Sequence, residues 1–137
     1  MIKSELNIRV RYSETDRMGV VYYGNYPQYY EVGRTELIRS FGLSYKKLEN
    51  EGIMLPVLSL DIKYLKPAMY DDLLTIKTKI VKFPAVRIEF EYEVYNQDNE
   101  LLNIGNTTLV FIDAETRKPK RAPTDFLLKL KKHFDND

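Results

Sequence analysis

One long amphipathic helix followed by four consecutive strands is the pattern that most constrains the fold of this chain. Residues 26–41 place apolar side chains on one helical stripe, and Gly33 in that stripe predicts close approach to a sheet. Asn25 is positioned to cap the helix, with Gln28 placed for a capping box. Alternating apolar segments then follow at 58–64, 74–80, 86–94 and 102–112. A single helix can cover one face of an antiparallel sheet, so the pattern predicts an α+β fold.

Shorter segments complete the predicted architecture. Residues 6–12 alternate apolar and polar side chains, which predicts a half-buried first strand with Tyr12 on its buried side. Ser44 is placed to cap a short second helix, and Thr124 to cap a closing helix. The polar run at 96–100 predicts a hairpin turn between the last two strands.

Composition bounds the chain to one domain over residues 1–137 and excludes several function classes. The net charge of +1 argues against a nucleic-acid binder. Cysteine is absent and His133 is the only histidine, so thiol chemistry, a zinc site and a Ser-His-Asp site all lack residues. We therefore predict no metal. The N-terminus has no apolar signal core, and no apolar run reaches membrane-spanning length, so we expect a soluble cytoplasmic protein without a membrane span.

Asp16 is the main candidate for chemistry. It lies in a polar turn that is followed by a short apolar run and the predicted helix start. Aspartates in turns commonly accept hydrogen bonds from nearby backbone N–H groups, which is the simplest explanation for the residue type. A carboxylate beside a helix N-terminus can also support hydrolysis, because the free N–H groups polarise a carbonyl while the carboxylate attacks it or activates water.

Residues 12–26 resemble the signature of the 4-hydroxybenzoyl-CoA thioesterase family, and most closely its Tol-Pal-associated branch of small acyl-CoA thioesterases. The resemblance extends from about Arg9 to Pro123. Within it, Asp16, Gly19 and Tyr22 match the family's Asp-x-x-Gly-x-x-Tyr context. The resemblance implies the hotdog fold, an antiparallel sheet wrapped around one long central helix.

The resemblance also implies roles for residues around the helix start. Asp16 matches the catalytic carboxylate, as nucleophile or general base. The backbone N–H that polarises the thioester carbonyl falls at Tyr23, where many relatives in the Tol-Pal branch carry histidine, so the match does not extend to the side chain. Tyr22, Gly24 and Asn25 fall in the substrate-binding part of the motif. For Tyr22 and Tyr23, packing at a subunit contact is an equal alternative. For Asn25, helix capping is the favoured role and ordering of the loop that carries Asp16 is the alternative.

Charged residues elsewhere give weaker candidates. Glu31 and Arg34 are spaced for an intrahelical ion pair, although another hotdog branch uses a helix glutamate as its catalyst. Arg87 opens a predicted strand, and Arg121 belongs to a basic cluster after the last strand. Either arginine could bind coenzyme A phosphates, but a solvated basic loop is the favoured explanation.

The predicted function is hydrolysis of an acyl-CoA thioester to a free acid and coenzyme A, with no cofactor. An acyl-carrier-protein thioesterase and a non-catalytic acyl-CoA-binding module remain as alternatives. A small monomer would not readily expose the aromatic surface of residues 22–30, so we expect a homodimer or homotetramer. The resemblance implies subunits paired edge to edge, with the sites at the subunit boundary.

Overall fold

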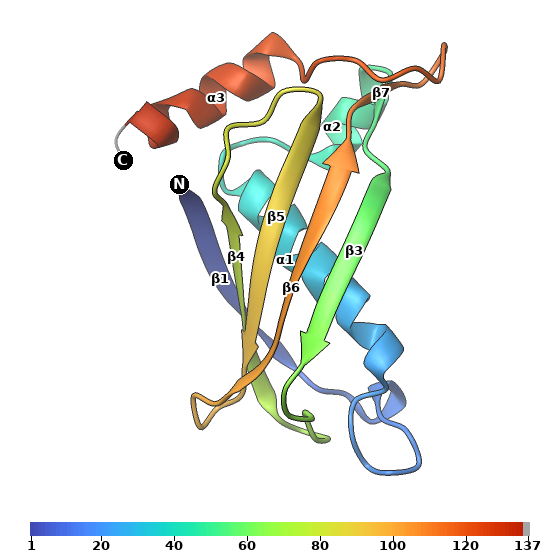
Figure 1. The fold of residues 1–137 in the computed structure, drawn as a ribbon, viewed down its shortest axis with the longest axis vertical. Coiled ribbons are helices and arrows are strands. Elements are labelled where there is room, and N and C mark those ends of the chain that lie inside the picture. The colour runs from blue at the N-terminus through green and yellow to red at the C-terminus, as the bar shows by residue number, and fades with distance from the viewer. Residues whose placement is uncertain (136–137) are drawn as a thin grey trace.

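The computed structural model describes residues 1–135 and contains one antiparallel sheet in the strand order β1-β4-β5-β6-β3 (Figure 1). The five strands are β1 (Ile2–Arg9), β3 (Val57–Tyr64), β4 (Leu73–Ile80), β5 (Arg87–Tyr95) and β6 (Leu101–Val110). Helix α1 (Tyr26–Arg39) lies across one face of this sheet. The α+β prediction and the hotdog arrangement of a sheet wrapped around one long helix are therefore confirmed.

The remaining elements lie mostly at the end of the sheet away from the start of α1 (Figure 1). They are α2 (Tyr45–Asn50), β2 (Ile53–Met54), β7 (Ile112–Asp113) and α3 (Thr124–Asp135). The Ser44 hydroxyl accepts a hydrogen bond from the Lys47 N–H at 3.0 Å, which confirms the predicted cap of α2. No helix within residues 1–135 is both long and apolar enough to cross a membrane.

Close contact between α1 and the sheet forms the core. A Cβ atom at Gly33 would clash with the Thr78 hydroxyl and press on Ile76, so the predicted close approach is confirmed. About one turn before Gly33 in α1, the Tyr30 ring stacks on the Tyr92 ring, with the two ring centroids 4.2 Å apart. The Tyr30 hydroxyl also donates to Asn103 Oδ1 at 2.6 Å. These contacts fix how far α1 can slide over the sheet.

The strand register brings several chain segments to the end of the sheet where α1 begins. Arg9 at the end of β1 pairs with Leu73 at the start of β4. The ends of β5 and β3 lie at the same end, because Tyr95 pairs with Leu101 and Tyr64 with Asn103 of β6. Loops from four strands therefore surround the helix start.

The first strand differs from its prediction. It runs from Ile2 to Arg9, and Tyr12 begins a 3₁₀ turn (Tyr12–Glu14) with its ring 78% exposed. The expectation that Tyr12 is buried in a strand is wrong. The chain leaves the sheet after Val10, whose N–H donates to the Asp72 carbonyl at 2.9 Å, because it has to turn toward the start of α1.

Candidate active site

Asp16 is held in a small hairpin that projects beside the start of α1. Its N–H donates to the Val20 carbonyl at 2.8 Å, and its carbonyl accepts from the Gly19 N–H at 3.0 Å. Thr15 and Val21 pair across the base of the hairpin. Gly19 has φ +79°, which non-glycine residues adopt only with strain. The Asp-x-x-Gly spacing of the motif is thus the spacing of a tight turn.

The Asp16 carboxylate makes the local turn hydrogen bond that its residue type predicts. It is half-buried, and its Oδ1 accepts a hydrogen bond from the Met18 N–H at 2.8 Å. This local bond fixes the orientation of the side chain. Among the described residues it is the only hydrogen bond to the carboxylate, which leaves Oδ2 available for a substrate or a water molecule.

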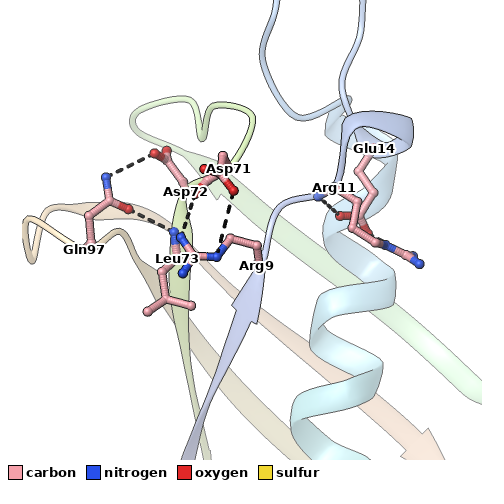
Figure 2. Close-up of polar contacts among 7 residues, drawn as sticks. All are labelled: Arg9, Arg11, Glu14, Asp71, Asp72, Leu73 and Gln97. Atoms are coloured by element: carbon pink, nitrogen blue, oxygen red, sulfur yellow. Dashed lines mark hydrogen bonds and ion pairs between the residues drawn. The ribbon is translucent and has the colours of Figure 1, made fainter.

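Glu14 connects the Asp16 hairpin to the helix start. Its backbone carbonyl accepts from the Tyr22 N–H at 2.9 Å and from Asn25 Nδ2 at 2.8 Å. Its side chain is 9% exposed and accepts from the Arg11 N–H at 2.8 Å (Figure 2). Arg11 Nη2 contacts the second carboxylate oxygen at 3.4 Å. Sequence reasoning did not single out Glu14; the available signal was its position two residues before Asp16 in the motif.

Asn25 is not the helix cap. Its backbone is already helical, with φ −84° and ψ −18°, and its side chain makes no capping hydrogen bond. The capping box predicted with Gln28 is therefore wrong as well. The Asn25 side-chain amide instead donates a hydrogen bond to the Glu14 carbonyl. This bond orders the loop that carries Asp16. The helix begins earlier than predicted, through a 3₁₀ turn at Tyr23–Asn25 that continues into α1.

The 3₁₀ turn leaves backbone donors at the helix start. The Asn25 N–H donates to the Tyr22 carbonyl at 2.9 Å, whereas the N–H groups of Tyr23 and Gly24 precede any intrahelical acceptor. A Cβ atom at position 24 would lie 2.6 Å from the Tyr22 ring, so a larger residue there would displace this exposed side chain. The positive end of the helix dipole therefore opens toward the Asp16 hairpin with two N–H groups available.

Tyrosines form one wall of this site. The rings of Tyr22 and Tyr23 lie 4.8 Å apart and are about half to two-thirds exposed, at 48% and 63%. The Tyr64 hydroxyl donates to the Tyr23 carbonyl at 3.3 Å. The neighbouring Tyr23 phenol raises the pKa of Tyr22, and burial raises the pKa of Tyr64. Both phenols therefore stay protonated at neutral pH and can donate hydrogen bonds but not act as bases.

The loop after β3 supports the Asp16 hairpin from the sheet side. The Val21 N–H donates to the Ala68 carbonyl at 2.8 Å, and Val20 pairs with Met69. Figure 2 shows how this loop is closed: Gln97 Nε2 donates to the Asp72 carboxylate at 3.1 Å, and Gln97 Oε1 accepts from the Leu73 N–H. Residues 64–72 are thus more than a strand connection, because they position the hairpin.

The structure does not bring the other candidates to this site within one chain. Arg87 opens β5 at the end of the sheet opposite Tyr95, and the eight residue-to-residue steps between them span about 26 Å. Arg121 is exposed and lies near Arg87, because the N–H of the next residue, Ala122, donates to the Ala85 carbonyl at 2.8 Å. Arg34 is buried rather than paired with Glu31: it contacts the Tyr92 hydroxyl, and the predicted intrahelical ion pair is not formed.

Metal ligation has no basis in the described part of the chain, since residues 1–135 contain no cluster of acidic and histidine side chains that could hold an ion. What the site offers is a carboxylate in a hairpin tied to the helix start, two backbone donors at that start, and partly exposed tyrosines beside them. That is the arrangement implied for a hotdog thioesterase.

Comparison with known proteins agrees with this class. Residues 10–130 match the model of the thioesterase-like superfamily, so the chain belongs to this family. It is 33% identical over 124 residues to the acyl-CoA thioester hydrolase YbgC of Escherichia coli, covering 90% of this chain and 92% of that protein. The crystal structure of the DHNA-CoA thioesterase of Staphylococcus aureus superposes with a TM-score of 0.93 at 37% identity, covering 98% and 93% of the two chains.

A third relative acts on a different carrier. The chain is 32% identical over 121 residues to a chloroplast acyl-acyl carrier protein thioesterase of Arabidopsis thaliana, covering 88% of this chain and 64% of that protein. The family resemblance predicted from residues 12–26 is confirmed by these matches.

Substitutions at Asn25 test whether its side chain tethers the loop or caps the helix. Aspartate caps helices as well as asparagine does, but it cannot donate to the Glu14 carbonyl. We expect Asn25→Asp and Asn25→Ala to lower the free energy of unfolding by similar amounts, about 1 kcal/mol each. Urea denaturation measures both. A near-neutral Asn25→Asp beside a destabilised Asn25→Ala would show that capping is the role.

Proposed function

We propose that this protein hydrolyses acyl-CoA thioesters to a free acid and coenzyme A. The observation that carries the proposal is that the Glu14 carbonyl ties the hairpin of Asp16 to the first turn of the helix, where the N–H groups of Tyr23 and Gly24 have no intrahelical acceptor. Family membership supports the reaction class, and the named relatives act on acyl-CoA or acyl-carrier-protein thioesters.

Each group has a defined task in the proposed reaction. The thioester carbonyl oxygen accepts a hydrogen bond from the Tyr23 N–H, with the Gly24 N–H as a second donor, and these stabilise the negative charge that develops on that oxygen. Asp16 either attacks the carbonyl carbon, releasing the coenzyme A thiolate and forming an anhydride that water then hydrolyses to the free acid and the regenerated carboxylate, or it removes a proton from a water that attacks the carbonyl carbon and displaces the thiolate. Both routes use the carboxylate of Asp16 and need no metal or organic cofactor.

Hydrolysis of an acyl-carrier-protein thioester is the second candidate. The same carboxylate and donors would act on the same thioester, and the chloroplast relative favours it. The two differ in what binds outside the acyl pocket. Parallel assays with one acyl group on coenzyme A and on carrier protein separate them.

Replacing Asp16 tests the catalytic assignment. Asp16→Asn keeps the shape and the hydrogen bond from Met18, but removes the charge, so kcat should fall by on the order of 10²-fold or more while substrate binding changes little. Asp98→Asn, at an exposed hairpin turn, is the matched control and should keep wild-type turnover. If a folded Asp16→Asn retains most of its turnover, or if Glu31→Gln is inactive in its place, the assignment to Asp16 is wrong.

The free edge of the sheet supports a dimer. β3 is an edge strand, and the side chains that it directs toward α1 are not covered by the helix: Leu58 is 54% exposed, Leu60 41% and Tyr64 48%. An exposed apolar edge with unpaired backbone groups favours pairing with another strand. We therefore propose a homodimer in which two β3 strands pair antiparallel about a two-fold axis.

This pairing would also complete the site. In an antiparallel β3 pair, the Tyr64 end of one subunit lies against the Val57 end of the other. Each Asp16 would then face the end of the partner that carries β7, α3 and the basic residues Arg87 and Arg121. Such a position is consistent with the predicted role of these arginines in binding coenzyme A phosphates across the subunit boundary.

A charge on the β3 edge should prevent dimerisation. Leu60→Lys is expected to shift the protein to monomer at micromolar concentration and to remove most activity. Ile104→Lys is the matched control, because Ile104 is 38% exposed and shares its face with Lys63, away from α1. Sedimentation velocity measures the outcome. A wild-type protein that is monomeric and fully active at these concentrations would contradict the proposed dimer.

Loss of a basic residue should weaken substrate capture without changing the chemistry. Arg87→Ala or Arg121→Ala is expected to raise KM for acyl-CoA several-fold, with little change in kcat and a weaker dependence on salt. A truncated thioester that lacks the nucleotide is the control and should show no such difference. If both variants have the wild-type KM for the full substrate as well as for the truncated one, the phosphate contacts lie elsewhere.

A further inference from the structure

Arg34 is a buried cation without a partner of opposite charge. Its side chain comes from α1 and is only 8% exposed. Nη1 reaches the Tyr92 hydroxyl at 3.5 Å, the long limit for a hydrogen bond, and Nε has no hydrogen-bond partner. A guanidinium does not lose its proton at any pH that the protein experiences. Buried charges in folded proteins are normally paired with an opposite charge. An anion that binds beside Arg34 would therefore supply the missing charge.

An open cavity of about 270 Å³ borders Arg34. Tyr45 lines the same cavity, and its hydroxyl is buried beside Arg34 without a close hydrogen-bond partner among the described residues. Burial raises the pKa of Tyr45, so its hydroxyl keeps the proton that it can donate. The rest of the wall is largely apolar, with Leu48, Ile53, Leu55 and Leu109. Convergent polar donors within apolar walls are typical of a site for a small organic molecule.

Acidic side chains of the protein do not neutralise Arg34. Glu31 and Glu49 line the rim of the cavity, and both are exposed to solvent. Among the described residues neither is ion-paired with Arg34, whose guanidinium lies beside the hydroxyls of Tyr92 and Tyr45. The positive charge inside the cavity is therefore available to a ligand, while the two rim carboxylates disfavour a multiply charged anion such as a phosphate. A singly charged carboxylate fits this balance.

We propose that the cavity between α1 and α2 binds a carboxylate, which accepts hydrogen bonds from Arg34 and Tyr45 while its hydrocarbon part packs on the apolar wall. This site is separate from the candidate active site of the same chain, because Tyr23 and Arg34 are eleven residues apart, about 16 Å along a helix. The carboxylate has two possible sources. It is either a free carboxylic acid or the far end of an acyl group that carries a second carboxylate; the second source rests on the proposed function.

Direct titration tests the site without any hydrolysis. Hexanoate should bind the wild-type protein at least about tenfold more tightly than hexanamide, which has the same shape but no charge. Arg34→Met should abolish that preference, and Arg39→Met, an exposed arginine of the same helix, should keep it. Calorimetry or chemical shifts in NMR spectra report the affinities. Equal binding of hexanoate and hexanamide to the wild type would overturn the proposal.

A second variant, Tyr45→Phe, tests the proposal even if Arg34→Met does not fold. Tyr45→Phe removes only an unpartnered hydroxyl, so the fold should be kept while hexanoate binds several-fold more weakly. Unchanged hexanoate affinity in Tyr45→Phe, if Arg34→Met does not fold, would also overturn the proposal. Because no thioester is present, these titrations can fail while the proposed hydrolysis stands, and the reverse also holds.

Kinetics then identify the source of the carboxylate. If the site holds the far end of the acyl group, Arg34→Met should raise KM for adipoyl-CoA several-fold and leave KM for hexanoyl-CoA unchanged. If it holds a free acid, the two KM values should respond alike, and added hexanoate should change wild-type turnover of hexanoyl-CoA but not that of Arg34→Met.

Discussion

Two hydrogen bonds to one carbonyl oxygen determine the geometry of the candidate active site. The Glu14 carbonyl accepts from the Tyr22 N–H and from the Asn25 side chain, at 2.9 and 2.8 Å. The first bond closes the hairpin that carries Asp16, and the second ties that hairpin to the first turn of the helix. Without both, the carboxylate and the free N–H groups would belong to two independently moving segments. The Glu14 side chain is buried and accepts a hydrogen bond from the Arg11 N–H, which holds Glu14 in place in addition to the two bonds at its carbonyl.

Catalytic power in such a site would come from preorganisation rather than from unusual acidity. The donors at Tyr23 and Gly24 are backbone groups, so they need no reorganisation when charge develops on a carbonyl oxygen. The phenols of the wall remain protonated and cannot compete with Asp16 as bases. In the proposed mechanism a carboxylate, two backbone donors and a wall of tyrosines together carry out thioester hydrolysis. Because Arg87 and Arg121 lie at the far end of the same sheet, the nucleotide end of the substrate would depend on a second subunit.

Sequence reasoning succeeded where periodicity or a tight local motif decides the structure. The alternation of 74–80 and 86–94, the apolar stripe of α1 and the glycine approach at Gly33 all predicted the observed fold. It failed at Asn25, because a cap and a tether use the same residue type at the same position, and only the fold brings the Glu14 carbonyl within reach. Arg34 was misjudged for a similar reason: its spacing from Glu31 fits an ion pair, but packing against Tyr92 buries it instead.

A crystal structure of the Asp16→Asn protein with a bound acyl-CoA tests the central claim most directly. The thioester carbonyl oxygen should lie within hydrogen-bond distance of the Tyr23 or Gly24 N–H, about 2.7–3.1 Å. Residue 16 should lie on the opposite side of the carbonyl carbon, close enough for attack directly or through one water molecule. A thioester bound away from the helix start, with its carbonyl oriented by other groups, would contradict the account.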